Sequence, residues 1–303
     1  MVIIISIVNS EIFDYEKNKE YLEKLCRKFP FIKAEAISRT SLSRGIFSLS
    51  LGNRQNSVLY IGGVHGCEWI TSLALYRFVE TLGECLMFNR LIKGINIKKA
   101  FGQLGVTIIP CLNPDGVEIA VHGSNSAKSM RKFVESLGCE EYSQWTYNAM
   151  GVDINHNFDA GWHLLRRMEE EKGITGPSSR QFAGSYPESE AETKAITKLC
   201  RTFKFRQAIA LHSQGEELYW QYGENTPPQS NMMAKILADS CSYKLVNNDG
   251  LASHGGFKDW FIEEFSKPAF TLEIGKGKNP LPVSELDSIY EKIEEALVIF
   301  ALM

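Results

Sequence analysis

Short apolar runs alternate with segments of helical periodicity from Val58 to the end of the chain, and this alternation restricts the fold more than any other feature. We predict strands at 58–61, 105–110, 206–212 and 268–273, and helices at about 69–82, 187–203, 230–241, 256–265 and 283–301. Such alternation predicts an α/β fold with a doubly wound, mixed but mostly parallel sheet and helices on both faces. Because ligands of such folds gather outside the carboxyl ends of the strands, the fold class also predicts where a functional site lies.

The other segments complete a single domain over residues 1–303. Residues 1–56 are expected to form a lead-in, with a first strand at 1–8, an amphipathic helix at 16–29 and a strand pair within 34–51. Residues 114–187 lack strong periodicity and are rich in Gly, Ser and Asn, so we expect a long irregular segment that serves the site. With 303 residues, of which 44% are hydrophobic, the chain can bury a full core.

Charge and composition argue against several classes of protein. A formal net charge of −3 argues against a nucleic-acid binder. No apolar stretch reaches 18 residues, and the first residues lack the basic region and cleavage site of a secretory signal, so we expect no membrane segment and a cytoplasmic location. The seven cysteines are scattered without C-x-x-C pairing, which favours a reducing compartment over a disulfide framework.

Three of the predicted strands end in residues that bind metals or carry protons. His65 and Glu68 follow the strand at 58–61, His212 ends the strand at 206–212, and Glu273 ends the strand at 268–273. A catalytic zinc takes three nitrogen or oxygen ligands and keeps an open position for water. An H-x-x-E pair alone is a weak signal, and a solvated loop pair is its simplest interpretation. Its position between two glycines and a helix start favours a metal site with His65, Glu68 and His212 as ligands.

Five blocks of sequence occur in the order and spacing of the zinc carboxypeptidase superfamily, which the chain resembles from about residue 58 to 275. The blocks are Val64–Trp69 (VHGCEW), Asn113–Gly116 (NPDG), Gly151–Phe158 (GVDINHNF), Leu211–His212 and Phe270–Glu273 (FTLE). Within that superfamily the chain looks most like the bacterial branch that cleaves γ-D-glutamyl-diaminopimelate bonds in cell-wall peptides. The similarity to this branch rests on His212–Trp220 (HSQGEELYW) and Glu273–Pro282 (EIGKGKNPLP).

This resemblance implies roles for the residues at the strand ends. His65, Glu68 and His212 would bind one zinc ion per chain, although cobalt, manganese or iron would also suit two histidines and a carboxylate. Glu273 would take a proton from the attacking water and hand it to the leaving amine, a role that suits a carboxylate in a partly desolvated cleft. Ion pairing with a nearby lysine is the alternative for Glu273. Asp153 would orient a metal-bound histidine.

The expected contacts to the substrate depart from the family pattern. Asn155 stands where the family places an asparagine that holds a terminal carboxylate, but His156 replaces the usual arginine. A neutral histidine is a poorer clamp for a carboxylate, and a simple turn residue is the alternative. Arg131 is the candidate cation for the oxyanion, with a solvated surface arginine as its alternative. The shorter spacing of the bacterial branch would place Thr146 there, which cannot supply the charge.

Two further cations could meet a substrate carboxylate. Lys258 stands at the position that sets side-chain preference in the family, where a buried ammonium would attract an acidic group such as the second carboxylate of diaminopimelate. A lysine on the helix surface is the alternative. Arg180 is either another carboxylate ligand or a solvated loop residue. The tyrosine that caps the substrate in pancreatic-type members is absent, because Leu251 stands at its position.

The sequence therefore predicts a mononuclear zinc peptidase that hydrolyses an amide bond in a small cell-wall peptide, a muropeptide. The predicted bond joins γ-D-glutamate to meso-diaminopimelate, and the expected partner is this small peptide, with no nucleic acid and no membrane. An ordinary metallocarboxypeptidase, a zinc deacylase of small amino-acid conjugates and a non-catalytic muropeptide-binding protein are the alternatives.

Overall fold

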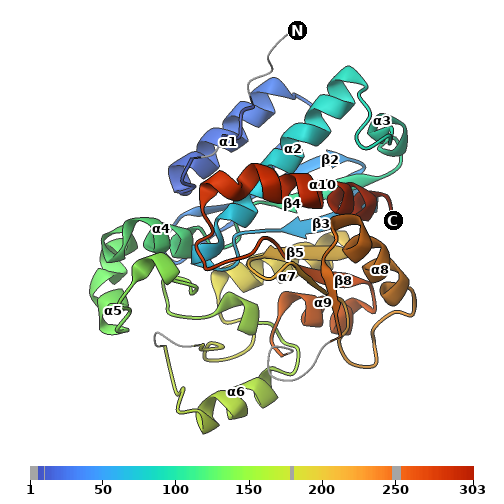
Figure 1. The fold of residues 1–303 in the computed structure, drawn as a ribbon. Helices are drawn as coiled ribbons and strands as arrows, with labels where there is room; N and C mark the ends of the chain where they lie inside the picture. The colour runs from blue at the N-terminus through green and yellow to red at the C-terminus, as the bar shows by residue number, and fades with distance from the viewer. Residues whose placement is uncertain (1–5, 10, 178–180, 248–253) are drawn as a thin grey trace.

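A computed structural model describes residues 6–9, 11–177, 181–247 and 254–303. Its centre is an eight-stranded sheet with the strand order β1-β2-β4-β3-β5-β8-β6-β7 (Figure 1). The strands are β1 (Lys33–Arg39), β2 (Gly45–Gly52), β3 (Ser57–Ile61), β4 (Gly105–Ile109), β5 (Ala208–His212), β6 (Glu217–Tyr219), β7 (Lys244–Val246) and β8 (Ala269–Glu273). The central strands β4, β3, β5 and β8 are parallel, whereas β2 and β6 pair antiparallel with their central neighbours. The predicted fold class is confirmed.

Helices cover both faces of the sheet, because successive side chains of a strand point to opposite sides. Tyr60 of β3 packs into a core shared with α1 (Tyr15–Lys28), α2 (Ile70–Phe88), α8 (Gln229–Cys241) and α10 (Leu286–Leu302). The adjacent Leu59 packs on the other side with α7 (Ala191–Phe203) and α9 (Phe257–Phe265). Figure 1 shows the two layers with the sheet between them. None of the helices in the described ranges combines the length and the apolar character of a membrane-spanning helix.

Most predicted elements are confirmed within a few residues, and two segments differ from the expectation where the structure describes them. Ser6–Val8, the described part of the expected first strand, is not in the sheet, and residues 1–5 lie outside the described residues. The backbone N–H of Ile7 instead donates to the buried carboxylate of Glu80 at 2.9 Å. Ile7 and Val8 thus lie beside α2 rather than in the sheet, and the Glu80 carboxylate satisfies their backbone donors.

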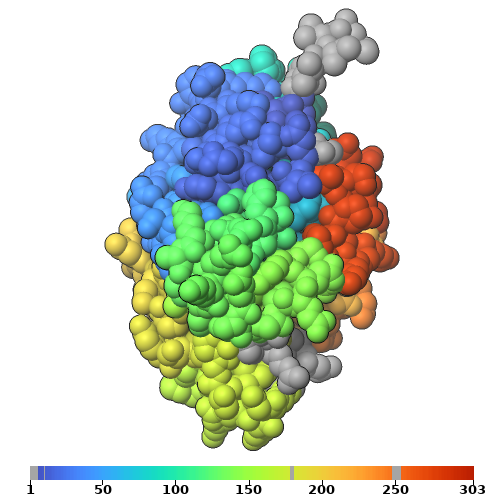
Figure 2. Space-filling model, turned by 90° about the vertical axis from the view of Figure 1, so that its left-hand side faces the viewer, coloured from blue at the N-terminus to red at the C-terminus, as the bar shows by residue number. Residues whose placement is uncertain are grey.

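The segment at 114–187 is more regular than predicted. It contains α4 (Pro114–His122), α5 (Arg131–Ser136) and α6 (Trp162–Glu171). These helices are too short for a periodic pattern to stand out from a sequence rich in Gly, Ser and Asn. In Figure 2 the green part of this segment covers one side of the molecule, between the blue lead-in and the yellow-green α6. The strands β6 and β7 were not predicted, and each has three residues.

Candidate active site

The loop that follows β3 carries His65 and Glu68 and is fixed by short contacts. Gly63 turns the chain at a φ of 56°, and a side chain there would approach Ser72 Oγ to 2.6 Å. The Thr71 hydroxyl accepts from the N–H of Gly63 at 2.8 Å and donates to the carbonyl of Glu68 at 2.7 Å. The start of α2 therefore holds both candidate ligands at the carboxyl end of β3.

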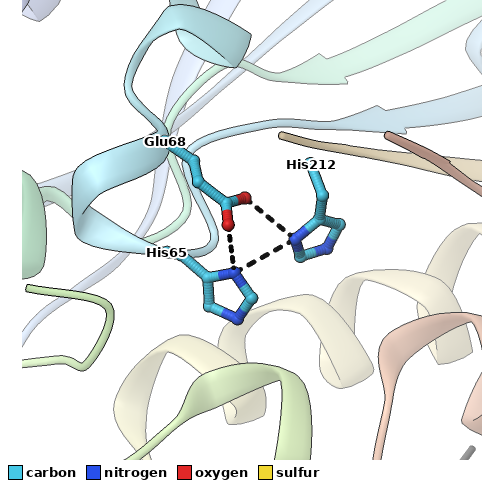
Figure 3. A group of neighbouring side chains, drawn as sticks. All are labelled: His65, Glu68 and His212. Carbon is cyan, nitrogen blue, oxygen red and sulfur yellow. Dashed lines mark hydrogen bonds and ion pairs between the residues drawn. The ribbon is translucent and has the colours of Figure 1, made fainter. Parts of the chain in front are cut away.

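The structure brings His65, Glu68 and His212 together, as Figure 3 shows. His65 Nδ1 lies 2.8 Å from Glu68 Oε1, and His212 Nδ1 lies 3.1 Å from Glu68 Oε2. The two Nδ1 atoms are 3.2 Å apart. Zinc ligands about 2.0–2.1 Å from the metal stand roughly 3.3 Å from one another in a tetrahedral site, so these spacings fit a zinc ion.

The chemistry of this cluster also fits a cation. The facing atoms are imidazole nitrogens and carboxylate oxygens, and a neutral Nδ1 that accepts cannot bond to another acceptor. Although burial opposes protonation, the carboxylates of Glu68 and Asp153 raise the pKa of His65 well above its ordinary value. Burial also opposes the charged form of Glu68, yet His65 and His212 lower its pKa to about 2. The cluster thus favours a positive charge at its centre, which a bound metal ion would supply.

Asp153 lies behind His65, where the sequence placed it. Its Oδ1 is 3.3 Å from His65 Nε2, so a proton on Nε2 leaves Nδ1 unprotonated and facing Glu68. The carboxylate also accepts from the N–H of Asn155 at 3.0 Å, which fixes its own orientation. Burial opposes the ionised form, but the neighbouring His156 and His65 lower the pKa of Asp153 below its ordinary value. This geometry matches the predicted orienting role.

Glu273 lies beside the cluster because its strand, β8, is paired in parallel with β5. His212 and Glu273 are partners in the register of these strands. Burial and the negative charge of Glu68 raise the pKa of Glu273 to about 8, and the carboxylate of Glu217 contributes in the same direction. A dication bound to Glu68 would remove the second of these causes. A carboxyl group with a raised pKa is suited to both accepting and donating a proton near neutral pH.

Asn155 and His156 lie on a short 3₁₀ turn, Ile154–His156, one residue after Asp153. Asn155 Oδ1 accepts from the N–H of Phe257, the first residue of α9, at 3.1 Å. His156 is buried, its Nδ1 lies 3.7 Å from Asp153 Oδ2, and no hydrogen-bond partner of that nitrogen is found among the described residues. His156 is therefore packed beside the metal cluster rather than exposed in a turn.

Lys258 is buried, which rules out the alternative of a lysine on the helix surface. Its ammonium group forms an ion pair with the adjacent Asp259 and donates to the carbonyl of Gln221 at 2.9 Å. Burial raises the pKa of Asp259 to about 6, although Lys258 acts against this shift. The predicted buried ammonium is thus present with a carboxylate beside it.

The geometry does not support the expected role of Arg131. Its side chain is 55% exposed at the start of α5, and its Nε donates to Glu135 at 2.8 Å. In the described part of the chain, no hydrogen bond or ion pair connects Arg131 to the metal cluster. Thr146 is close to the cluster, since its carbonyl accepts from Gly66 at 3.1 Å, but its side chain carries no charge. Arg180 and Leu251 lie outside the described residues.

The sequence analysis missed one acidic residue close to the site. Glu217 of β6 is the register partner of Glu273 of β8 in an antiparallel pair. The pair Glu216-Glu217 was visible in the sequence, but its strand is too short to predict, and its place beside β8 is a tertiary contact.

A second group of potential metal ligands lies at the surface, where Asp14, Glu118 and His122 approach one another. His122 Nε2 is 3.1 Å from Asp14 Oδ2. Glu118 already pairs with Arg44 at 3.0 Å, so its charge is balanced without a metal. This group is the weaker candidate, because His122 is half-exposed and a simple His–Asp contact accounts for it.

Comparisons with known proteins agree with this geometry. Residues 19–296 match the family described as zinc carboxypeptidase. The chain is 31% identical to γ-D-glutamyl-L-diamino acid endopeptidase 1 of Lysinibacillus sphaericus over 290 residues, which are 95% of this chain and 71% of that protein.

Solved structures share the fold at lower sequence identity. Bovine thrombin-activatable fibrinolysis inhibitor, solved with a tick carboxypeptidase inhibitor, superposes with a TM-score of 0.73 at 18% identity, over 96% of this chain and 97% of that one. The murein-tripeptide amidase MpaA of Escherichia coli O157 superposes with a TM-score of 0.55 at 18% identity, over 89% and 92%. The family match covers most of the chain, and the chain therefore belongs to the zinc carboxypeptidase family and is a zinc metallopeptidase.

Proposed function

We propose that this protein hydrolyses the amide bond between γ-D-glutamate and meso-diaminopimelate in small cell-wall peptides, with one zinc ion held by His65, Glu68 and His212. The observation that carries the proposal is the position of Glu273 beside the three potential metal ligands, directly opposite His212 on the neighbouring strand. The similarity to an endopeptidase named for γ-D-glutamyl-L-diamino acid bonds, over 95% of this chain, supports the substrate class.

Different residues of the chain have different roles in hydrolysis. A zinc ion held by His65, Glu68 and His212 would polarise the scissile carbonyl and would lower the pKa of a water molecule to about 7. Glu273 accepts the proton of the attacking water and passes it to the nitrogen of the leaving amine. Asp153 keeps His65 in the orientation that exposes Nδ1 to the metal. Glu273 thus carries out both proton transfers of the reaction.

Binding of the substrate would use the residues next to α9. The Oδ1 of Asn155 is occupied by Phe257 N–H, so the amide nitrogen of Asn155 is the group available to a substrate carboxylate. His156 would support it more weakly than an arginine, because an imidazole lacks the two parallel donors of a guanidinium. Lys258 would take the second carboxylate of diaminopimelate with a donor that neither Asp259 nor Gln221 uses.

The experiment is mass spectrometry of the products formed from L-alanyl-γ-D-glutamyl-meso-diaminopimelate by the zinc-loaded protein, with Glu273→Gln as the blank. Release of free diaminopimelate by the native chain alone is the expected result. No release at stoichiometric zinc would refute the cell-wall assignment. Release of hydrophobic C-terminal residues from ordinary peptides would then identify a carboxypeptidase, and hydrolysis of an acylated amino acid would identify a deacylase. Binding of the tripeptide without turnover would identify a muropeptide-binding protein.

A further inference from the structure

Two carboxylates face each other beside the metal cluster. Glu217 and Glu273 are register partners on the antiparallel strands β6 and β8. Side chains directly opposite on such strands lie on the same face with Cβ atoms about 4.5–5.5 Å apart, and like charges in these positions repel. A Cβ atom at Gly215 would lie 3.5 Å from both Glu217 Cγ and Glu273 Cβ, which places the two side chains against the same point of the backbone.

The present partners of Glu217 leave its carboxylate able to bind another cation. Tyr219 Oη donates to Oε2 at 2.7 Å, and Lys244 Nζ lies 3.1 Å from Oε1. The Lys244 side chain is 72% exposed, so this pair contributes little and is readily exchanged. A carboxylate offers about four acceptor positions, of which these contacts use two. Repulsion between Glu217 and Glu273 would be relieved by a positive charge that enters with a ligand.

We infer that Glu217 is a specificity-determining residue that binds the free second ammonium group of a diamino acid on the leaving-amine side of the scissile bond. This inference rests on the proposed function. A diamino acid joined to γ-D-glutamate through one nitrogen keeps its other nitrogen as an ammonium, which an apolar amino acid of the same length lacks. A carboxylate next to the proton carrier Glu273 is close to the leaving nitrogen and in reach of a side chain attached there.

The same stretch of chain leads from Glu217 to Lys258. Gln221 lies four residues after Glu217, two residues beyond the end of β6, and its carbonyl accepts from Lys258 Nζ at 2.9 Å. The segment that begins with Glu217 therefore also contacts Lys258, through the backbone of Gln221. The distal carbon of diaminopimelate carries both an ammonium and a carboxylate, which call for one acidic and one basic partner. Glu217 would select for the ammonium, and Lys258 would select for the carboxylate.

The test compares two peptides that differ in the ammonium group, L-alanyl-γ-D-glutamyl-L-lysine and L-alanyl-γ-D-glutamyl-L-norleucine. We expect the zinc-loaded wild type to show a kcat/KM at least about tenfold higher for the lysine peptide, as a charge-assisted hydrogen bond allows. Glu217→Gln should reduce that ratio to within about twofold of one while norleucine release continues. Glu216→Gln is the matched control, because Glu216 pairs with Lys276 and Lys292 instead, and it should keep the wild-type ratio.

Each result decides one point. Equal hydrolysis of both peptides by the wild type would overturn the inference and leave the proposed function standing. A preference for lysine that survives in Glu217→Gln would also overturn it, since another group would then bind the ammonium. Loss of kcat on both peptides with an unchanged ratio would show that Glu217 only positions Glu273. Failure of the wild type to cleave either peptide, while it still releases diaminopimelate from L-alanyl-γ-D-glutamyl-meso-diaminopimelate, would overturn the inference alone. Failure on all three peptides at full zinc occupancy would refute the proposed function and the inference with it.

Discussion

Asp153 Oδ1 lies 3.3 Å from His65 Nε2, on the side of the imidazole opposite to the metal cluster. With a metal bound at Nδ1, this contact would keep the proton on Nε2 and would make Nδ1 a stronger ligand. The order carboxylate, imidazole, cluster is the arrangement that typically strengthens metal binding.

Replacing Asp153 by Asn should therefore weaken metal binding, because a neutral amide holds the Nε2 proton less well. The expected loss of zinc affinity is about 10–100-fold, measured by competition with a chromophoric chelator. Asp159→Asn is the matched control, since Asp159 is exposed in the same segment, and it should bind zinc like the wild type. Equal affinities for the two variants would contradict the orienting role of Asp153.

Replacing Glu273 by Gln should remove the proton carrier without removing the metal. We expect kcat to fall by about 10²–10⁴-fold with one equivalent of zinc retained, measured by product release and by metal analysis of the same sample. In the wild type, kcat/KM should fall as the pH drops through the pKa of Glu273, because only the ionised carboxylate accepts a proton.

The position of this acid limb follows from the causes of the pKa shift. The raised value of about 8 depends on burial and on the charge of Glu68, and a dication at Glu68 acts against the second cause, so the limb should lie below pH 8. Residual activity of Glu273→Gln should lack this limb. A wild-type acid limb that persists unchanged in the variant would assign the base to another residue.

The number of zinc ions per chain separates the two groups of potential ligands. We expect one tightly bound equivalent, which His212→Ala abolishes and His122→Ala retains, measured by native mass spectrometry. Removal of the metal should also lower the free energy of unfolding of the wild type by about 4 kcal/mol, relative to the protein in zinc at a thousandfold of the Kd. Loss of an equivalent in His122→Ala would show that the surface group of Asp14, Glu118 and His122 binds zinc as well.

Arg131 provides a test of the oxyanion assignment. Because the side chain is exposed and paired with Glu135, we expect Arg131→Ala to change kcat/KM by less than about threefold. A donor to the oxyanion would cost about 10²–10³-fold in kcat when removed. A loss of that size would mean that Arg131 leaves its exposed position during catalysis and contacts the oxyanion, as the sequence indicated. Glu135→Gln serves as the control, since it breaks the same ion pair without removing the cation.

The sequence predicted the parts of the site that depend on single strand ends. His65, Glu68, His212 and Glu273 follow apolar runs that read as buried strands, and parallel strands bring their carboxyl ends to one edge. The same argument could not find Glu217, because β6 has three residues and no detectable period. Its antiparallel pairing with β8 depends on a reversal of the chain that only the tertiary structure fixes.

Arg131 and Lys258 show that the sequence alone also does not predict whether a charged side chain on a helix is buried. Sequence position alone does not say whether a lysine or arginine on a helix reaches inward or outward, since both side chains are long enough to do either. The structure buries Lys258 beside Asp259 and exposes Arg131 beside Glu135. Lys258 pairs with a carboxylate one residue further along the chain, and Arg131 pairs with one four residues further along. The packing of each helix then determines whether the pair is buried.

The buried pair of Lys258 and Asp259 predicts how stability depends on pH. Burial raises the pKa of Asp259 to about 6 from an ordinary value of 3.8, so the folded state holds this proton more tightly than the unfolded state. Stability is therefore lost as the pH rises from about 4 to about 6, by about 3 kcal/mol from this group at 1.36 kcal/mol per pKa unit. Lys258 limits the loss, because its charge lowers the pKa of Asp259.

Lys258→Met should extend that loss to higher pH, since an ionised Asp259 would then be buried without a partner. We expect destabilisation of about 3–5 kcal/mol at pH 8 and much less at pH 5, where Asp259 is protonated, measured by urea unfolding at both pH values. The double variant Lys258→Met with Asp259→Asn should lose this difference between pH 5 and pH 8, and Lys276→Met, at an exposed lysine, should match the wild type. Equal destabilisation by Lys258→Met at both pH values would mean that the lysine acts through packing alone, and the electrostatic account of the pair would be wrong.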